Sequence, residues 1–196
     1  SNKTVLIIGA GPSGLSAAYH LTRFGHKVTI YEAGPVAGGM MSFGIPAYRL
    51  PRNIIEAEVK RILDTGIELK LNHKVENIEH EMKAGKFDAC FLAIGAHLAK
   101  RIDIPTPDTS KILDAAGVLR EMETGKNPPK LGRRVVVYGG GDTAVDVART
   151  AKRLGAEETI IVYRSGPGQM KAHDFEVKEA LEEGVKLNWL STIKEM

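Results

Sequence analysis

An apolar run that leads directly into a glycine-rich turn constrains this chain more than any other feature. It reads Val5-Leu6-Ile7-Ile8-Gly9-Ala10-Gly11-Pro12-Ser13-Gly14. The run has the composition of a buried strand, and the residues after it have helical periodicity. In a strand–turn–helix unit, Gly9 permits the tight turn, Gly11 admits a pyrophosphate close to the backbone, and Gly14 allows the helix to pack closely. The pattern therefore predicts a dinucleotide site at the start of the helix.

An acidic residue strengthens this prediction. A second predicted strand, residues 27–31, ends at Glu32, which follows Gly9 by 23 residues. A carboxylate at this spacing can accept hydrogen bonds from both ribose hydroxyls of an adenosine, and it repels a 2′-phosphate. Glycine turns without such an acid are weak evidence, because plain βα turns also contain glycine. The first site is predicted to suit FAD or NAD, and the glycine-rich loop 33–39 is predicted to contact the ligand through its backbone.

The opening pattern returns later in the chain. After Asn127-Pro128-Pro129 come a predicted strand at 134–138, the turn Gly139–Ala144 in the variant GxGxxA, and a predicted helix at 145–154. The strand predicted at 159–163 leads to Arg164, which we match to Glu32 of the first motif. Opposite charges at the ribose position predict two different nucleotides. A plain turn and a solvated surface charge are the alternatives for the second motif and its arginine.

The rest of the sequence predicts further elements of an α/β protein. These are a helix that Pro51 opens and Gly66 ends, one or two strands within 67–75, a helix at 112–122, a helix at 175–183 and a strand at 185–190. The near-continuous apolar run 87–95 is typical of a parallel strand covered on both faces.

Composition excludes several classes of function. The 27 basic and 24 acidic residues are spread along the chain without a basic run, which argues against nucleic-acid binding. The single cysteine, Cys90, excludes an internal disulfide and a cysteine-ligated iron–sulfur cluster within this chain, and predicts a cytoplasmic setting. No apolar stretch reaches the length of a membrane span, and the six histidines lack metal-site spacing, so we expect no metal site.

Four further stretches resemble the two-dinucleotide-binding flavoprotein reductases, and in particular the small (beta) subunit of NADPH-dependent glutamate synthase. Glu32 with Gly38-Gly39 is similar to the family element ExxxxxGG, and the stretch 43–51 to YGIPxFRLP. The stretch that begins at Gly139 is similar to GGGDTAMDxxRTAxRxGA, and 180–185 matches a later family stretch. The resemblance covers nearly the whole chain.

The resemblance implies an α/β fold of two Rossmann-like units with parallel sheets. Residues 1–126 would bind FAD and include a connector at 103–126, and residues 127–196 would bind NADPH, with NADH possible. FAD contacts are implied for Gly9, Gly11, Pro12, Ser13, Gly14, Glu32, Ala33, Gly38, Gly39, Met40, Ile45, Arg49, Val75, Ala93, Ile94 and Gly95. NAD(P)H contacts are implied for Gly139, Gly140, Gly141, Asp142, Thr143, Ala144, Tyr163 and Arg164.

The resemblance also implies a reaction. Hydride would pass from the nicotinamide to the flavin, and electrons would continue through iron–sulfur clusters outside this chain to an acceptor such as a glutamate synthase large subunit. No catalytic side chain is expected, because the flavin supplies the chemistry. We expect the chain to be a fragment that lacks a closing FAD segment at its carboxyl end. Two alternatives stay open: a nucleotide-binding module without turnover, and a related reductase with another electron acceptor.

One stretch departs from the family pattern. Where the family has two arginines in a VYRRSREEMPA-like segment, this chain has Arg164 followed by Ser165. One cation discriminates a 2′-phosphate less strongly than two. The sequence therefore predicts NADPH as the coenzyme and leaves NADH as the alternative.

Overall fold

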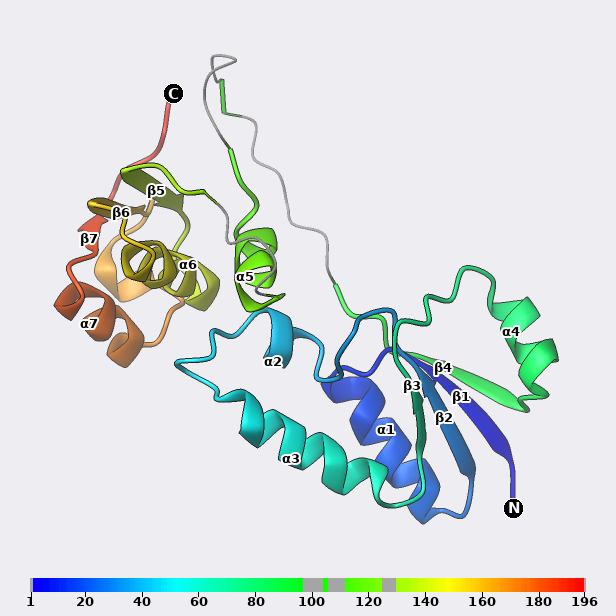
Figure 1. Cartoon of the computed structure of the whole chain (residues 1–196). Coiled ribbons are helices and arrows are strands. Elements are labelled where there is room, and N and C mark those ends of the chain that lie inside the picture. The colour runs from blue at the N-terminus through cyan, green and yellow to red at the C-terminus, as the bar shows by residue number, and fades with distance from the viewer. Residues whose placement is uncertain (1, 97–103, 106–111, 125–129, 196) are drawn as a thin grey trace. The chain divides into compact units, whose positions relative to one another are not determined.

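The computed structural model describes residues 2–96, 104–105, 112–124 and 130–195. The chain divides into two compact units, residues 1–96 and 97–196. Each unit contains a parallel sheet packed against helices (Figure 1). The two parallel sheets agree with the predicted α/β fold.

The first unit alternates strands and helices around a four-stranded sheet of order β3-β2-β1-β4. Its elements are β1 (Thr4–Ile8), α1 (Pro12–Arg23), β2 (Lys27–Tyr31), α2 (Met40–Phe43), α3 (Arg52–Leu63), β3 (Glu68–Lys70), α4 (Ile78–Gly85) and β4 (Ala89–Leu92). Strand β1 pairs with β2 so that Ile8 lies opposite Tyr31. The carboxyl ends of both strands therefore meet where the first glycine turn begins.

Side chains of β1 alternate between two apolar clusters. Ile7 packs with Ile30 in a cluster to which α1 and α3 contribute. Leu6 packs with Tyr31 and with Phe87, which follows α4, in a second cluster. Figure 1 shows α1 and α3 on one face of this sheet and α4 on the other. A strand that is covered on both faces needs apolar residues at every position, which explains the unbroken apolar run that opens the sequence.

Strand β4 corrects one expectation. The run 87–95 is predicted to be covered on both faces, but β4 lies at the edge of the described sheet and pairs only with β1. Phe91 is 41 % exposed and Leu92 is 55 % exposed. The prediction of complete burial is wrong for the described residues, because α1 lies over β1 and β2 rather than over β4.

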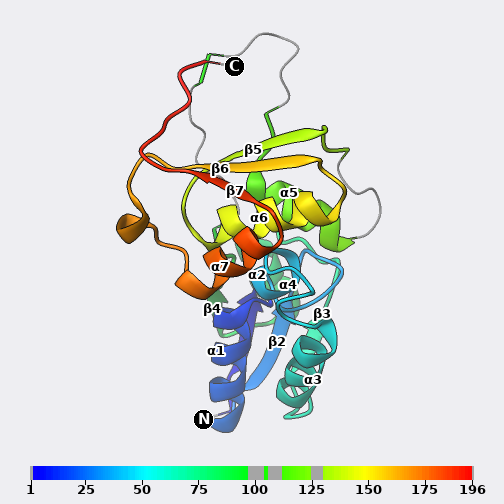
Figure 2. The same cartoon turned by 90° about the vertical axis from the view of Figure 1, so that its left-hand side faces the viewer.

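The second unit repeats this plan with a three-stranded sheet of order β5-β6-β7. Its elements are α5 (Ala115–Thr124), β5 (Arg134–Tyr138), α6 (Asp142–Arg153), β6 (Glu158–Val162), a short 3₁₀ turn (Pro167–Gln169), α7 (Asp174–Glu182) and β7 (Lys186–Asn188). Figure 2 shows α5, α6 and α7 on the same side of this sheet. Val137, Val145 and Ile161 form the centre of the apolar core between them.

Helix α5 changes the predicted boundary between the units. Its residue Leu119 is 2 % exposed and belongs to the core of the second unit, so α5 packs with the second sheet and is not part of a connector that ends the first unit. The boundary falls at 96/97 instead of 126/127. Within the predicted connector 103–126, residues 103, 106–111 and 125–126 lie outside the described residues, and so does the stretch 127–129, on which the later boundary was predicted.

Two other predicted elements differ in extent. The stretch 67–75 contains one short strand, β3. The helix predicted at 112–122 begins only at Ala115, because both carboxylate oxygens of Asp114 accept backbone N–H groups, from Ala116 at 3.1 Å and from Gly117 at 3.0 Å. A side chain that satisfies these first N–H groups sets the start of a helix.

An ion-pair network joins α6 to α7. The Arg149 side chain is 5 % exposed, and it contacts Glu179 and Glu183 at 2.7 Å each. Arg153 reaches the same Glu183 oxygen at 2.6 Å. Burial raises the pKa of Glu183, but the hydrogen bonds and charges of the two arginines outweigh it and lower the pKa to about 2. The network fixes the helix whose first turn belongs to the second glycine motif.

Candidate functional site

Gly9 and Gly14 are required by the fold itself. Gly9 has φ +106°, and its N–H donates to the Tyr31 carbonyl oxygen at 2.8 Å. A Cβ atom on Gly9 would overlap the carbonyl oxygen of Ala93, and a Cβ atom on Gly14 would overlap that of Gly9. The sequence prediction of a tight turn with close helix packing therefore agrees with the geometry.

Gly11 has a different reason for being glycine. Its backbone is extended, with φ −78° and ψ −177°, which any residue can adopt. A Cβ atom there would find no neighbour closer than the Gly39 Cα at 3.8 Å. No side chain caps α1 at this end, so its first backbone N–H groups are left for a ligand. A gap that the protein leaves open beside uncapped N–H groups fits a pyrophosphate.

Glu32 lies at the end of β2 with its carboxylate held at both oxygens. Oε2 accepts the N–H of Ala10 at 2.7 Å, and Oε1 accepts the N–H of Gly34 at 2.7 Å. A carboxylate has about four lone-pair sites, so each oxygen keeps capacity for one further donor. The side chain is half-buried and oriented beside the glycine turn, as a ribose-binding acid needs to be.

The glycine-rich loop after β2 folds back onto the first turn. The N–H of Gly38 donates to the Ala10 carbonyl oxygen at 2.8 Å, and a Cβ atom on Gly39 would lie 2.8 Å from the Gly11 Cα. Gly38 and Gly39 have φ angles of +109° and +55°. This region thus presents backbone rather than side chains, as the sequence predicts.

Sequence reasoning missed Arg52, which organises the loop from α2 to α3. Its guanidinium donates to the carbonyl oxygens of Met41, Leu50 and Ile45 at 3.0, 3.0 and 2.6 Å. The segment from the start of α2 to the start of α3 contains the predicted contacts Met40, Ile45 and Arg49. In the sequence, Arg52 is marked only by its position directly after Pro51, which opens a helix. The carbonyl groups that it binds are evident only in the folded structure.

The remaining predicted residues of the first site divide into two groups. Ala93 lies against Gly9 and Gly14, and Ile94 and Gly95 follow it directly, with Ile94 61 % exposed. Pro12, Ser13 and Ala33 are exposed beside the turn and the end of β2. Val75 packs instead against the apolar cluster on the α4 face of the sheet.

The second glycine turn is also open. Gly139 has φ +155°, and its N–H donates to the Val162 carbonyl oxygen at 3.1 Å. Gly141 precedes α6 without a side-chain cap, and a Cβ atom there would meet nothing within 4 Å. A cavity of about 250 Å³ opens at this turn and is lined by Tyr138, Gly139, Gly140, Gly141, Val162, Tyr163, Arg164 and Lys171.

The sheet register corrects the match between Arg164 and Glu32. Gly9 bonds to the last residue of β2, and Gly139 bonds to the last residue of β6, so Tyr163 and not Arg164 occupies the position of Glu32. A Cβ atom on Gly140 would run into the Tyr163 ring. An aromatic ring therefore lies against the second turn, where the first turn has a carboxylate. Arg164 comes one residue later and still lines the cavity.

The other predicted residues of the second motif lie at the start of α6. Asp142 accepts the His173 N–H at 3.3 Å through Oδ1, which ties the helix start to the segment before α7. Thr143 is exposed, and Ala144 is buried next to Gly139. Lys171 was missed, because no motif marks it. Its backbone N–H donates to the Gly140 carbonyl oxygen at 2.9 Å, a contact that only the fold reveals.

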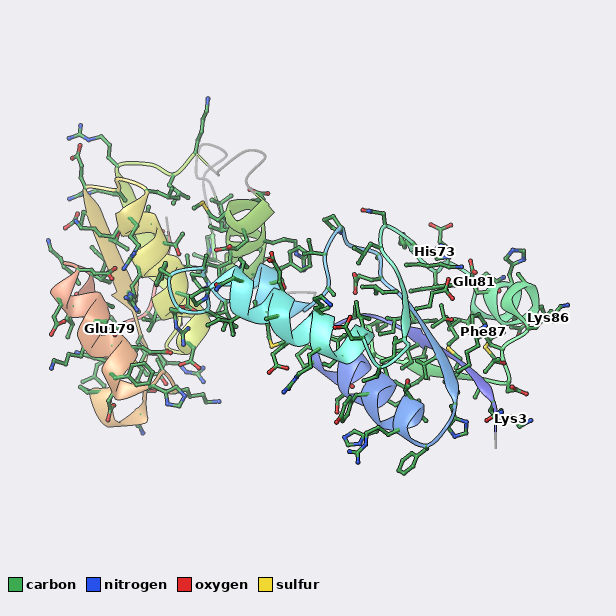
Figure 3. The ribbon with its side chains drawn as sticks, turned by 60° about the horizontal axis from the view of Figure 1, so that its bottom comes forward. Lys3, His73, Glu81, Lys86, Phe87 and Glu179 are labelled. Carbon is green, nitrogen blue, oxygen red and sulfur yellow. The ribbon has the colours of Figure 1, made fainter. Side chains whose placement is uncertain are left out.

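One histidine away from both glycine turns is paired with a carboxylate. Figure 3 shows His73 and Glu81 close together, and their nearest nitrogen and oxygen are 3.3 Å apart. Within the described ranges, no group of three or more His, Cys, Asp or Glu residues could hold a metal ion. None of the helices in these ranges is long and apolar enough to cross a membrane.

Comparison with known proteins gives the family. The profile of the pyridine nucleotide-disulphide oxidoreductase family matches residues 3–196. The beta subunit of NADP(+)-dependent formate dehydrogenase from Moorella thermoacetica is 42% identical, over 97% of this chain and 27% of that protein. The small chain of glutamate synthase [NADPH] from Escherichia coli (strain K12) is 36% identical, over 96% of this chain and 42% of that protein. The resemblance to the glutamate synthase small subunit is thus confirmed.

A solved structure supports the fold. FprA from Mycobacterium tuberculosis in complex with NADPH superposes with a TM-score of 0.78 at 22% identity, over 94% of this chain and 48% of that one. At this identity the likeness shows the fold alone, and it confirms the Rossmann-like class. The chain spans between a quarter and a half of the length of these three proteins. It belongs to the pyridine nucleotide-disulphide oxidoreductase family.

Proposed function

We propose that this chain contributes an FAD site and an NADPH site to a flavoprotein oxidoreductase of the glutamate synthase small-subunit type. One observation carries the proposal: both glycine turns leave backbone space and uncapped helix N–H groups open, and the side chains beside them differ in charge. Glu32 is held beside the first turn, whereas Arg164 lines the cavity at the second. Two such sites in one chain suit two nucleotides of different charge.

The first turn supports FAD as its ligand. The gap at Gly11 and the backbone of Gly38 and Gly39 would hold the pyrophosphate. The free lone pairs of Glu32 would accept the ribose hydroxyls of the adenosine. A 2′-phosphate in their place would meet the carboxylate, so we assign NADPH to the other turn.

The second turn supports a nicotinamide dinucleotide. The start of α6, with Gly141 open, would hold its pyrophosphate, and Arg164 would bind the 2′-phosphate of NADPH. The names of the Moorella and Escherichia relatives include NADP(+) and NADPH, and FprA was solved with NADPH. FAD, when bound, accepts hydride from the reduced nicotinamide, and the residues of this chain bind and orient the two nucleotides.

The electron acceptor has two candidates. The glutamate synthase relative favours a large subunit of that enzyme, whereas the relative with 42% identity is named for formate dehydrogenase and favours another acceptor. In either case we propose that iron–sulfur clusters outside this chain carry the electrons, in the cytoplasm. A nucleotide-binding module without turnover is the remaining alternative.

The test is anaerobic reduction of the complete protein that carries this chain. It should purify with FAD, and NADPH should bleach the visible absorbance of the flavin faster than NADH does. Arg164→Ala should remove most of that preference, because the guanidinium gives two parallel charge-assisted hydrogen bonds to a phosphate. A protein that neither retains nor takes up FAD would refute the flavoprotein assignment. Equal rates with both coenzymes, before and after the substitution, would remove Arg164 from the site.

A further inference from the structure

We propose that Lys171 is a second cation, beside Arg164, for the 2′-phosphate of NADPH. This inference rests on the proposed NADPH site and adds a specificity-determining residue to it. Arg164 and Lys171 come from opposite ends of the segment between β6 and α7, and both line the cavity of about 250 Å³ at the second glycine turn. Ser165, the neighbour of Arg164, carries no charge.

Neither cation has an anionic partner in the part of the chain that the structure describes. No ion pair or side-chain hydrogen bond joins Arg164 or Lys171 to a described residue, and both side chains are exposed. The segment 164–171 contains no aspartate or glutamate. Two like charges that face one cavity repel each other, and an anion with more than one negative charge removes that repulsion. The cavity therefore favours a phosphate group over a neutral ribose hydroxyl.

Core packing on both sides of Lys171 determines which way its side chain points. Met170 packs against the apolar core of the second unit, and Ala172 is 6 % exposed within that core. Met170 has extended backbone angles, φ −68° and ψ 137°. Successive side chains of an extended segment point in opposite directions. Because its two neighbours point into the core, Lys171 points away from it, toward the cavity that it lines.

Hydrogen bonds hold the segment in this conformation. The backbone N–H groups of Lys171 and Ala172 both donate to the Gly140 carbonyl oxygen, at 2.9 and 3.0 Å. The Tyr163 hydroxyl donates to the Gln169 carbonyl oxygen at 2.7 Å, so the segment is also tied to the end of β6. The 3₁₀ turn 167–169 lies between the two cations in the chain. The backbone of Lys171 is thus fixed against the glycine turn before any ligand binds, which limits the backbone entropy lost on binding.

The test compares NADP⁺ and NAD⁺ binding to the complete oxidised protein, in which no turnover occurs. Lys171→Ala should weaken NADP⁺ binding about five- to tenfold, which is the scale of one charge-assisted hydrogen bond at a solvent-exposed site. It should weaken NAD⁺ binding less than about twofold. Lys171→Arg should retain the native preference. Lys178→Ala is the matched control: Lys178 is an exposed lysine on α7, and its nearest acidic partner is Glu182 at 3.9 Å. This control should leave both affinities unchanged.

The outcomes separate the two proposals. If Lys171→Ala weakens the binding of both nucleotides equally, Lys171 contacts the pyrophosphate and the inference is overturned. An unchanged preference for NADP⁺ in Lys171→Ala, with the preference lost in Arg164→Ala, would overturn the inference and leave the NADPH site intact. If Lys171→Arg also loses the preference for NADP⁺, the positive charge of Lys171 is not the cause of that preference, and the inference is overturned. Native protein without any preference for NADP⁺ would refute the NADPH site itself.

Discussion

A pair of alanine substitutions distinguishes glycines that the fold needs from a glycine that the ligand needs. At Gly11 the backbone angles suit any residue, and the nearest atom to a new Cβ is 3.8 Å away. Gly11→Ala should therefore change the free energy of unfolding by less than about 1 kcal/mol. The same Cβ projects into the gap assigned to the FAD pyrophosphate. Loss of one or two charge-assisted hydrogen bonds to phosphate costs roughly 3 kcal/mol, or about a 100-fold rise in the Kd for FAD.

Gly9→Ala should behave in the opposite way. Its φ of +106° is strained for alanine, at a cost of about 1–3 kcal/mol, and the new Cβ would also overlap the Ala93 carbonyl oxygen. Urea unfolding of the apoprotein should therefore show a loss of stability for Gly9→Ala and a native midpoint for Gly11→Ala. FAD titration then measures the affinity of the stable variant. Native FAD affinity in a folded Gly11→Ala protein would refute the phosphate cradle. Gly11→Val, with a larger side chain, should abolish FAD binding.

Two further substitutions test side chains whose contacts are known. Glu32→Ala should weaken FAD binding by about 1–3 kcal/mol and should also destabilise the apoprotein, because the Ala10 and Gly34 N–H groups lose their acceptors. Glu32→Gln keeps one acceptor oxygen, so it should lose less FAD affinity and less stability. An unchanged Kd for FAD in Glu32→Ala would exclude Glu32 from the ribose site. Glu183→Gln should lower the free energy of unfolding by roughly 2 kcal/mol at pH 7. The native pKa of Glu183 is about 2, below its ordinary 4.5, so its stabilising contribution is complete above about pH 4.5 and is lost as the pH falls toward 2. The stability difference between native protein and variant should shrink over this range, and a difference that is the same at pH 7 and pH 3 would contradict the assigned ion pairs.

The strand–turn–helix units could be predicted because local sequence determines them. An unbroken apolar run indicates a strand with both faces covered, as β1 is, and Gly9 and Gly14 leave no room for a side chain in the folded unit. Coverage of β4 could not be predicted in the same way. The residues of β4, Ala89–Leu92, are also apolar throughout, but their exposure depends on which elements of the fold pack over the strand. The position of α5 likewise depends on long-range packing of Leu119 with the second core.

The second site shows most clearly where sequence reasoning fails. The strand predicted at 159–163 places Arg164 in the position of Glu32, but hydrogen bonds to Gly9 and Gly139 align Tyr163 instead, because β6 begins and ends one residue earlier than predicted. An aromatic ring therefore lies against the second turn, where the first turn has a carboxylate, and Arg164 lines the cavity one residue later. Lys171, seven residues further along the chain, lines the same cavity and can bind the same phosphate as Arg164. The residue after Arg164, Ser165, is uncharged, so the second cation that we propose is Lys171, at the other end of the folded segment.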